Sequence, residues 1–517
     1  MDYTYLINHS CFRAWLHLVL LFVFIGSAPV AFGQTFAPAV AYSTGANTNP
    51  SGVALADVNN DGKPDIITAN YVYTAASNMV YGVGVLLGNG NGTFQPVISY
   101  PTVINTSNGS PIEVKVSDIN ADNRLDIVAV SAYGSPAVVS VLLGNGNGTF
   151  QSPAIYPIYY AMSYSALGGV TVADINSDGK PDIMVSDYQQ YVVGVLLGNG
   201  NGTFQVPVYY STGANSFPTE IAVADVNGDG KADLITANWN DPNRTAITAL
   251  GVLLGNGNGS FQQVAVYSTG SASLPRKMVI TDVNGDGKLD VATAGFTGMY
   301  NGSVMILTGN GNGMFQPATS YLAASGATPN GIAMADMNGD GKRDIITADR
   351  YSSKAVVLKG NSNGTFQSAV TYTTGNSMTS SDVAVADLNS DGKPDMVVTN
   401  ETGTTVSVFL NTTPGTFLPT RAALPGASAT LAPNPTHAGT TLTATGLPAA
   451  ATQLTAMLTD ALGRPVRRLS VPATAGAATA AVPTTGLAAG LYLLRLDALD
   501  AQGAALGALP TQRLSVE

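Results

Sequence analysis

The sequence predicts an all-β protein of 517 residues, in which a seven-bladed β-propeller is followed by a smaller domain of short strands. The first observation is a nine-residue acidic loop that recurs seven times, 51 to 61 residues apart. The second is that each repeat carries four strand-like segments, and a repeat of this length that holds a whole supersecondary unit is typical of a propeller. The third is a sharp change of composition after Phe417, beyond which no acidic loop occurs.

Residues 1–33 have the features of a secretory signal peptide. Arg13 precedes the apolar run Leu18–Ala28, and the small residues in Ala31–Gly33 fit a cleavage site directly after them. The run is short for a membrane-spanning helix, although a membrane anchor is the alternative. We therefore expect export and no transmembrane segment in the mature chain. The single cysteine, Cys11, lies in the predicted signal, so we expect no disulfide in the mature protein.

Residues 34–420 hold the repeats, each with the same order of segments. An alternating segment leads into the acidic loop, and a second strand such as Asp65–Asn70 leaves it. After a segment of variable length, a third strand ends in a Gly/Asn-rich turn before a Phe, as in Leu86–Phe94, which predicts a hairpin into a fourth strand. The predicted mature chain opens with Thr35–Phe36 and the last such pair is Thr416–Phe417, so seven whole units fit between them.

The acidic loops follow the pattern D-x-N-x-D-G-x-x-D, which predicts one calcium site per blade and up to seven Ca²⁺ in all. Ca²⁺ takes about 6–8 oxygen ligands from carboxylates, amides and backbone carbonyls. Position six needs a residue that tolerates positive φ, and it is Gly in six copies and Asn123 in the other. The predicted ligands are the side chains of positions one, three, five and nine and the carbonyl of position seven. Loop by loop these are Asp57, Asn59, Asp61, Lys63 and Asp65; Asp118, Asn120, Asp122, Arg124 and Asp126; Asp174, Asn176, Asp178, Lys180 and Asp182; Asp225, Asn227, Asp229, Lys231 and Asp233; Asp282, Asn284, Asp286, Lys288 and Asp290; Asp336, Asn338, Asp340, Lys342 and Asp344; and Asp387, Asn389, Asp391, Lys393 and Asp395.

Two other kinds of loop share parts of this pattern. An EF-hand needs a bidentate Glu at position twelve, where this chain has Thr, Ala or Val, and its flanks are helices rather than strands. A metal-free Asp/Asn/Gly turn explains one copy, but it gives no reason for three carboxylates at fixed positions in seven copies, since these carboxylates repel one another. Seven divalent cations would more than offset the formal charge of −11. Because no basic patch with interleaved aromatics is present, nucleic acid is not an expected partner.

The repeats resemble the FG-GAP/VCBS type of integrin α-subunit propellers and exported bacterial proteins. The resemblance covers residues 34 to about 420 and rests on the acidic loops and the G-N-G-x-F hairpins. It implies calcium on one rim of the propeller and recognition on the opposite rim. The literal FG-GAP motif is poorly preserved in this chain, which favours the bacterial VCBS branch of the family.

After a linker at residues 421–430, residues 431–517 resemble the type A C-terminal sorting domain of the type IX secretion system of Bacteroidetes. The motifs that carry this resemblance are A-P-N-P, D-A-L-G-R-P-V, G-L-Y-L-L-R-L and R-L-S-V, in the family's order. The resemblance implies an immunoglobulin-like β-sandwich that engages the type IX machinery and directs the protein to the cell surface or the medium. A generic carbohydrate-binding sandwich is the alternative.

Catalytic groups are scarce in the predicted propeller. The only His of the mature chain is His437, outside the propeller, which excludes Ser-His-Asp, Cys-His and His-ligated zinc chemistry within it. Paired carboxylates remain open for glycoside cleavage. Asp187 and Asp349 hold equivalent places at the ends of second strands, where a turn role is the simpler interpretation. The carboxylates outside the loops are Glu113, Asp187, Glu220, Asp241, Asp349, Asp382 and Glu401.

The segments after the second strands differ in length and are rich in aromatic residues. They should lie on the rim opposite the loops, where such rings suit sugar rings or protein hot spots, although they can equally pack between blades. We expect a non-catalytic calcium-binding module, secreted or at the cell surface, that recognises a glycan or an extracellular protein. A polysaccharide lyase or glycosidase and a passive surface-layer component are the alternatives. The aromatic residues are Tyr71, Tyr73, Tyr81, Tyr133, Tyr188, Tyr191, Trp239, Phe296, Tyr300 and Tyr351.

Overall fold

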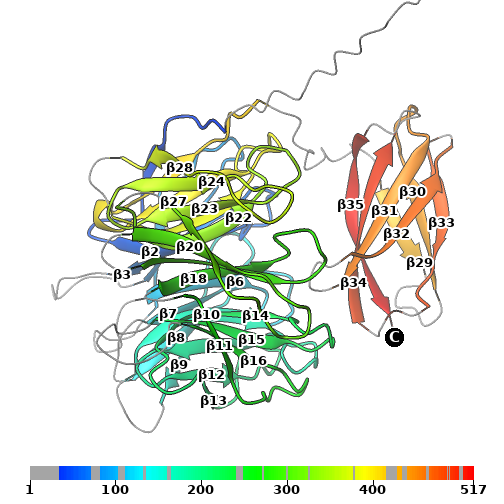
Figure 1. Cartoon of the computed structure of the whole chain (residues 1–517). Coiled ribbons are helices and arrows are strands. Elements are labelled where there is room, and N and C mark those ends of the chain that lie inside the picture. Colours follow the sequence, from blue (N-terminus) through cyan, green and yellow to red (C-terminus); the bar gives the residue numbers. More distant parts are fainter. Residues whose placement is uncertain are drawn as a thin grey trace, which may run out of the picture.

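The computed structural model is β-structure almost throughout the part of the chain that it describes (Figure 1). Among the described residues one short 3₁₀ helix, η2 (Glu401–Gly403), is the exception. The predicted signal peptide, 1–33, lies outside the described residues. The structure describes residues 34–71, 82–102, 111–131, 136–159, 165–239, 249–270, 273–297, 301–323, 326–375, 379–414, 428–432, 439–460, 465–474, 476–485, 487, 490–499 and 505–516.

The described part of residues 40–409 forms seven antiparallel four-stranded sheets, which we number as blades in chain order. Blade 1 contains β2 (Asn49–Ala56), β3 (Asp65–Tyr71), β4 (Gly82–Leu86) and β5 (Ile98–Pro101); blade 2, β6 (Pro111–Ser117), β7 (Asp126–Ser131), β8 (Ala137–Leu142) and β9 (Ala154–Ile158); blade 3, β10 (Leu167–Ala173), β11 (Asp182–Asp187), β12 (Val192–Leu196) and β13 (Val208–Ser211); blade 4, β14 (Pro218–Ala224), β15 (Asp233–Asn238), β16 (Ala249–Leu253) and β17 (Ala265–Ser268). Blade 5 contains β18 (Ser273–Thr281), β19 (Asp290–Thr297), β20 (Asn301–Leu307) and β21 (Thr319–Leu322); blade 6, β22 (Pro329–Ala335), β23 (Asp344–Asp349), β24 (Lys354–Leu358) and β25 (Val370–Thr373); blade 7, β26 (Ser380–Ala386), β27 (Asp395–Asn400), β28 (Thr405–Phe409) and β1 (Val40–Ser43).

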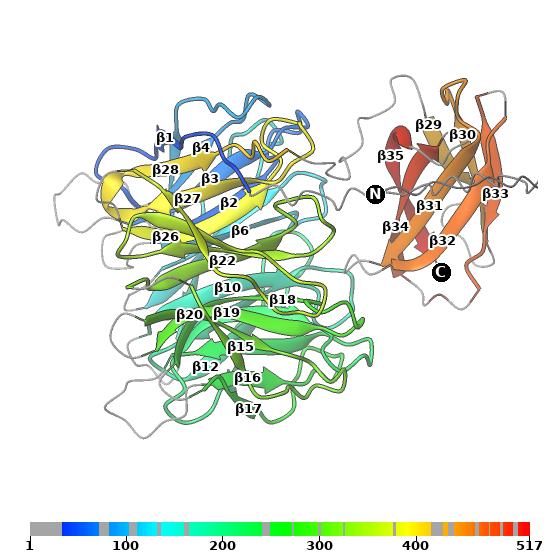
Figure 2. The ribbon, with the colours of Figure 1, turned by 45° about the horizontal axis from the view of Figure 1, so that its top comes forward.

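The blades are arranged as a ring. The first strands of successive blades contact one another in a closed cycle, from β2 through β6, β10, β14, β18 and β22 to β26 and back to β2. Figure 2 shows neighbouring first strands of this cycle, such as β22 and β26, beside each other. The second strands are buried along their whole length in most blades, because both faces of each sheet are covered by neighbouring sheets. The fourth strands form the exposed outer edge. This ring of radial sheets is a β-propeller, so the predicted all-β propeller fold is confirmed.

The two ends of the propeller segment close the ring within blade 7. Strand β1 pairs with β28, with Val40 opposite Val408. The backbone N–H of Ala37 donates to the carbonyl of Leu410 at 2.8 Å, and Phe36 forms a bridge with Asn411. The Thr-Phe pair at the start of the described chain therefore occupies the place that the Thr-Phe pairs after the turns occupy in the other blades.

A ring of aromatic pairs joins the outer parts of adjacent blades. The Phe after each turn meets, edge to face, the Tyr on the outer strand of the preceding blade, as in Phe150 with Tyr100 at 5.3 Å between ring centroids. In most pairs the Tyr hydroxyl also donates to a backbone carbonyl in the neighbouring turn, and Tyr210 does so to Gly259 at 3.1 Å. The other pairs are Tyr42–Phe94, Tyr156–Phe204, Tyr210–Phe261, Tyr267–Phe315, Tyr321–Phe366 and Tyr372–Phe36.

Because successive strands are antiparallel, the chain alternates between two rims of the ring. The acidic loops and the Gly/Asn turns lie on one rim, which we call the acidic-loop rim. The segments between second and third strands, and the connections between blades, lie on the other, which we call the opposite rim. The predicted separation of the acidic loops from the variable segments is confirmed.

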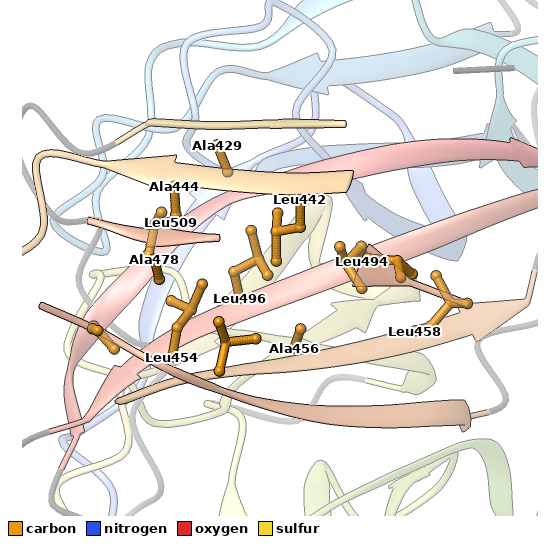
Figure 3. Packing of buried hydrophobic residues seen from close by; sticks show 14 of the residues in the cluster. Ala429, Leu442, Ala444, Leu454, Ala456, Leu458, Ala478, Leu494, Leu496 and Leu509 are labelled. Carbon is orange, nitrogen blue, oxygen red and sulfur yellow. The ribbon is translucent and has the colours of Figure 1, made fainter. Parts of the chain in front are cut away.

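Residues 428–516 form a second β-structure with two sheets. One sheet has the order β29 (Ser428–Ala432), β30 (Thr440–Thr445), β33 (Ala478–Val482), and the other has the order β32 (Pro465–Pro472), β31 (Gln453–Asp460), β34 (Gly490–Leu499), β35 (Ala505–Val516). Alternating residues of both sheets meet in one apolar core, where Leu442 faces Leu454 and Leu496 (Figure 3). This arrangement is a β-sandwich, rich in alanine and leucine. His437 lies outside the described residues.

No helix among the described residues is both long and apolar enough to span a bilayer.

Candidate functional site

Each acidic loop is folded around its own side chains. In the first loop, the carboxylate of Asp57 accepts hydrogen bonds from the backbone N–H groups of Asp61, at 3.0 Å, and Gly62, at 2.7 Å. The amide oxygen of Asn59 also accepts from Asp61, and Asp61 accepts from Lys63. Equivalent bonds recur in the other six loops. Positions one, three and five therefore present side-chain oxygens toward the interior of a tight turn.

Two positions of every loop are in the left-handed region. Position six has φ between +63° at Asn123 and +82° at Gly230, as its residue types predict. Position four is also left-handed, which the sequence did not reveal, because that position holds Asn, Ala, Ser or Gly in different copies. Ala121 has φ +59° there, a conformation that costs a non-glycine residue about 1 kcal/mol.

The ninth-position Asp is fully buried and ties the loop to the neighbouring hairpin. In the first loop, one oxygen of Asp65 accepts from the N–H of Val58 at 2.9 Å, and the other accepts from the N–H of Gly88 at 2.7 Å. Burial raises the pKa of Asp65 to about 6; the two amides lower the pKa, and the nearby carboxylates of Asp57 and Asp61 raise it. The same amide pair reaches the ninth Asp in every loop, with Asn411 in the place of Gly in blade 7.

Position seven, predicted to supply a carbonyl ligand, carries a cationic side chain in every loop. Its Lys or Arg side chain forms an exposed ion pair with the fifth-position carboxylate, from 3.3 Å at Lys63–Asp61 to 3.9 Å at Lys288–Asp286. From the sequence, position seven was predicted only as a carbonyl ligand, and this ion pair was not predicted. The signal was the presence of Lys or Arg at position seven in all seven copies. Exposed pairs of this kind contribute less than about 1 kcal/mol each.

The predicted ligands are thus in one turn in each loop, but they do not converge on a common point. Among the described residues, no group of three or more His, Cys, Asp or Glu side chains is close enough to hold a metal ion. The donor set still fits Ca²⁺: it is all oxygen, and its three carboxylates lie near enough for two of them to raise the pKa of the third. Calcium binding would require the carboxylates of positions one and five to turn toward the buried carboxylate of position nine.

Charged residues from the first strands meet at the centre of the ring. Lys277 of blade 5 forms ion pairs with Glu113 of blade 2 and, at 2.9 Å, with Glu220 of blade 4. Lys115, two residues along the same strand, also pairs with Glu113 at 2.9 Å. Glu113 and Glu220 are nearly inaccessible, and burial raises the pKa of Glu220 and lowers that of Lys277. Since blades 2 and 5 are not neighbours, these pairs bridge the centre of the ring, and they give Glu113 and Glu220 a structural role.

The two carboxylates at second-strand ends are turn residues. Asp187 is fully buried, and one of its oxygens accepts from the N–H groups of Ala166, Gln189 and Gln190. Asp349 is equally buried and accepts from the N–H of Thr328 at 2.7 Å. Neither presents a carboxylate to solvent. Asp241 lies outside the described residues.

Some of the described aromatic side chains of the opposite rim pack inside the fold, and others are exposed to solvent. Tyr191 and Trp239 both pack against Phe217, with ring centroids 4.8 and 6.3 Å away, in the connection between blades 3 and 4. Tyr71 donates a hydrogen bond to Glu401, whereas Tyr351 is 63% exposed. Tyr73, Tyr81, Tyr133 and Tyr300 lie outside the described residues, as does the side chain of Phe296.

The outer wall between blades 2 and 3 contains a cavity of about 310 Å³. Its lining is aromatic and apolar for the most part, with no carboxylate, cysteine or histidine among the residues that line it. Its lining residues are Tyr156, Pro157, Tyr159, Leu196, Phe204, Gln205, Val206, Pro207 and Tyr209.

Comparison with known proteins matches the repeats to a family. Residues 118–185, 174–236, 239–293, 282–347 and 336–398 match the model of the FG-GAP-like repeat, and residues 49–84 match that of the FG-GAP repeat. Cartilage acidic protein 1 of Mus musculus is 24% identical over 344 residues, which cover 60% of this chain and 50% of the relative. Integrin alpha-IIb of Mus musculus is 28% identical over 159 residues, which cover 28% of this chain and 15% of the relative. The chain therefore spans half or less of the length of these curated relatives.

Among solved structures, the BP39L lectin of Burkholderia pseudomallei superposes with a TM-score of 0.51 at 14% identity. The match covers 72% of this chain and 98% of the lectin. At this identity the likeness concerns the propeller fold alone.

Proposed function

Because the chain belongs to the FG-GAP-like repeat family, we propose that it is a calcium-stabilised recognition module that binds a glycan or an extracellular protein and has no catalytic activity of its own. The observation that carries this proposal is the contrast between the rims. Seven loops of one design occupy the acidic-loop rim, whereas the residues at equivalent places on the opposite rim differ in size and charge from blade to blade. Binding sites usually form where variable loops are held by a rigid scaffold.

Calcium is proposed to hold the loops rather than to take part in a reaction. The residues that would hold each ion are the side chains of positions one, three, five and nine and the carbonyl of position seven, as in Asp225, Asn227, Asp229, Asp233 and Lys231. A bound cation offsets the mutual repulsion of three carboxylates, of which Asp225 and Asp233 are buried in the fourth loop. Up to seven such ions would stabilise the ring, in a protein whose predicted mature chain has no cysteine for disulfides.

The absence of catalysis is proposed on the state of the available carboxylates. Asp187 and Asp349 are buried and bonded to turn amides, and Glu113 and Glu220 pair with lysine at the centre of the ring. A glycosidase needs two carboxyl groups that reach the substrate, either about 5–5.5 Å or about 6.5–9.5 Å apart. None of these four is accessible in that way.

The location is proposed to be the cell surface or the medium. The apolar N-terminal segment suits export, and the motifs in residues 431–517 suit recognition by the type IX secretion machinery. The described β-sandwich is compatible with that role, since it presents Gly490–Leu496 and Arg513–Val516 as adjacent strands β34 and β35.

An array of glycans and matrix proteins tests the recognition function. The full chain, shown to be folded by circular dichroism, is applied in millimolar calcium and again in a chelator. Saturable binding in calcium that the chelator abolishes is the expected result, because the rim loops depend on the ring for their geometry. If folded protein binds nothing in either buffer, the proposal is overturned in favour of self-assembly. If it releases oligosaccharide products from a polysaccharide, the proposal is overturned in favour of catalysis.

A further inference from the structure

The acidic loop of one blade contacts the Gly/Asn turn of the next blade, and we call each such contact a junction. At the junction of blades 1 and 2, the backbone N–H of Gly148 donates to the carbonyl of Val58, at position two of the first loop, at 3.3 Å. Two other junctions have the same bond, each at 3.0 Å. They are Gly313 to Val226, between blades 4 and 5, and Gly92 to Leu388, between blades 7 and 1.

At three further junctions the turn packs closely against the preceding blade. Gly364, in the turn of blade 6, lies so near Asn284 that a Cβ at Gly364 would be 2.7 Å from the Cβ of Asn284. Asn284 is at position three of the fifth loop and is a predicted calcium ligand, so the turn contacts the loop beside a donor group. The other contacts of this kind are Gly259 with Asn176, at 3.6 Å from such a Cβ, and Gly202 with Leu143, at 3.0 Å.

A single side chain makes the junction between blades 6 and 7. The amide Nδ2 of Asn411 donates to the carbonyl of Met337, at position two of the sixth loop, at 2.8 Å. It also donates to the carbonyl of Pro394, at position eight of the seventh loop, at 3.0 Å. The backbone N–H of Asn411 donates to the ninth-position Asp395 at 2.7 Å. Asn411 is 1% exposed, so it joins both loops from a buried position.

Hydrogen bonds also connect the turn to the loop within each blade. In the first loop, the N–H of Val58 donates to the buried Asp65, while the carbonyl of Val58 accepts from Gly148 of the next turn. The same turn donates the N–H of Gly144 to Asp126, the buried carboxylate of the second loop, at 2.7 Å. A path of hydrogen bonds and turn backbone therefore runs from one ninth-position Asp to the next. Because the ring is closed, every loop has two neighbours.

From this path we propose that the seven loops bind calcium cooperatively, so that each filled loop raises the calcium affinity of its two neighbours. The predicted ligands of a loop do not converge on a common point, so binding has to order the segment from position one to position five. The next turn contacts that segment, and the same turn holds the ninth-position carboxylate of the following loop.

Ordering one loop therefore reduces the conformational entropy that its neighbour loses on binding, which is the condition for positive cooperativity. This inference rests on the calcium sites of the proposed function and states how they are regulated.

Equilibrium dialysis of the full chain tests the coupling, because it gives the number of calcium ions bound at each free calcium concentration. Asp61→Ala, Asp229→Ala and Asp286→Ala each remove one exposed carboxylate, from the first, fourth and fifth loops. Each variant should lose one ion, and its two neighbouring loops should bind calcium about fivefold more weakly or worse. If the remaining sites of every variant keep the affinity of the parent chain, the loops are independent and the coupling is wrong.

Two double variants sharpen this test, since both lack two sites. Asp229→Ala with Asp286→Ala removes adjacent loops and affects three junctions, whereas Asp229→Ala with Asp61→Ala removes distant loops and affects four. In a cooperative ring the effects of the distant pair add, and those of the adjacent pair sum to less than the two single effects. Additive effects in both double variants would overturn coupling between neighbours.

Asn411→Ala tests one junction without removing a predicted ligand. The chain should still bind all its ions, while the sixth and seventh loops bind calcium about fivefold more weakly or worse. Asn400→Ala is the matched control, because it removes a fully buried side-chain amide of the same blade at the opposite rim, and it should leave calcium binding unchanged. An equal loss of affinity in the two variants would indicate general destabilisation and would overturn the coupling through Asn411.

The failure of the coupling and that of the proposed calcium sites are distinguishable. If the folded parent chain binds calcium and every variant shows independent sites, the coupling alone is wrong and the calcium-stabilised module stands. If the folded parent chain binds no calcium, both are wrong.

Discussion

The two rims of the propeller are built on opposite plans. On the acidic-loop rim, seven loops share the same hydrogen bonds, the same two left-handed positions and the same buried Asp. On the opposite rim, equivalent positions hold Tyr71 in blade 1, Trp239 in blade 4, Arg350 in blade 6 and Glu401 in blade 7. A rim that is the same in every blade and a rim that differs from blade to blade are the distribution expected when the first serves stability and the second serves binding.

Removal of calcium should produce the largest effect and should act through one rim only. At a calcium concentration ten times the dissociation constant, each site contributes about 1.4 kcal/mol, so seven sites together contribute about 10 kcal/mol to the free energy of unfolding. We expect a large fall in Tm in chelator, measured by calorimetry and restored by added calcium. An unchanged Tm in chelator would show that the loops are metal-free turns. As a control, Arg350→Gln on the opposite rim should respond to chelator like the parent chain.

On the acidic-loop rim, the buried carboxylate of position nine and the exposed carboxylate of position five should differ in their effect on stability. Asp233→Ala leaves the N–H groups of Val226 and Gly255 without acceptors, which should lower the free energy of unfolding by about 4 kcal/mol, in chelator as well as in calcium. Asp229→Ala removes an exposed side chain and should have little effect in chelator, but it should cost one calcium site, counted by titration. Chemical denaturation in both buffers measures this difference. Equal effects of the two variants in chelator would contradict the structural role of the ninth position.

On the opposite rim, one carboxylate should make stability depend on pH. Burial raises the pKa of Glu401 to about 7, so the folded state holds its proton more tightly than the unfolded state does. The resulting stabilisation is full below about pH 4.5 and is lost as the pH rises through about 7, up to about 3 kcal/mol in all. Denaturation curves between pH 5 and 8 should show this loss in the parent chain. Glu401→Gln should lack it, and an identical pH profile in the variant would refute the assignment.

The smallest expected effect concerns the one loop that departs from the common pattern. Ala121 is left-handed where several other loops have Gly, so Ala121→Gly should raise the free energy of unfolding by about 1 kcal/mol. Ala232→Gly, at a position in the fourth loop that is not left-handed, is the control and should be destabilising. Thermal unfolding in calcium measures both. A destabilised Ala121→Gly variant would mean that this loop differs from the others in backbone as well as in sequence.

The sequence predicted features that repeat and missed those that join distant repeats. The positive φ at position six followed from Gly and Asn alone, and the propeller followed from the spacing of the loops. The ion pair between Lys277 and Glu113 could not be predicted from the sequence. These residues are 164 positions apart, and they come into contact only after the ring has formed. The edge-to-face contact of each Phe with a Tyr of the preceding blade was missed for the same reason: the pattern showed both rings in one repeat, while the contact lies between two.

The closure of blade 7 has a consequence for how the chain folds. Strand β1 is synthesised first, yet its partner β28 is among the last propeller strands to be made, and about 370 residues separate Val40 from Val408. Bringing the ends of so long a segment together costs about 5 kcal/mol of chain entropy, a cost recovered only when the ring is complete. Until then the edge of β28 is open to pairing with a strand of another molecule. The ring therefore closes late in folding, and a chain without residues 34–44 should associate through that edge.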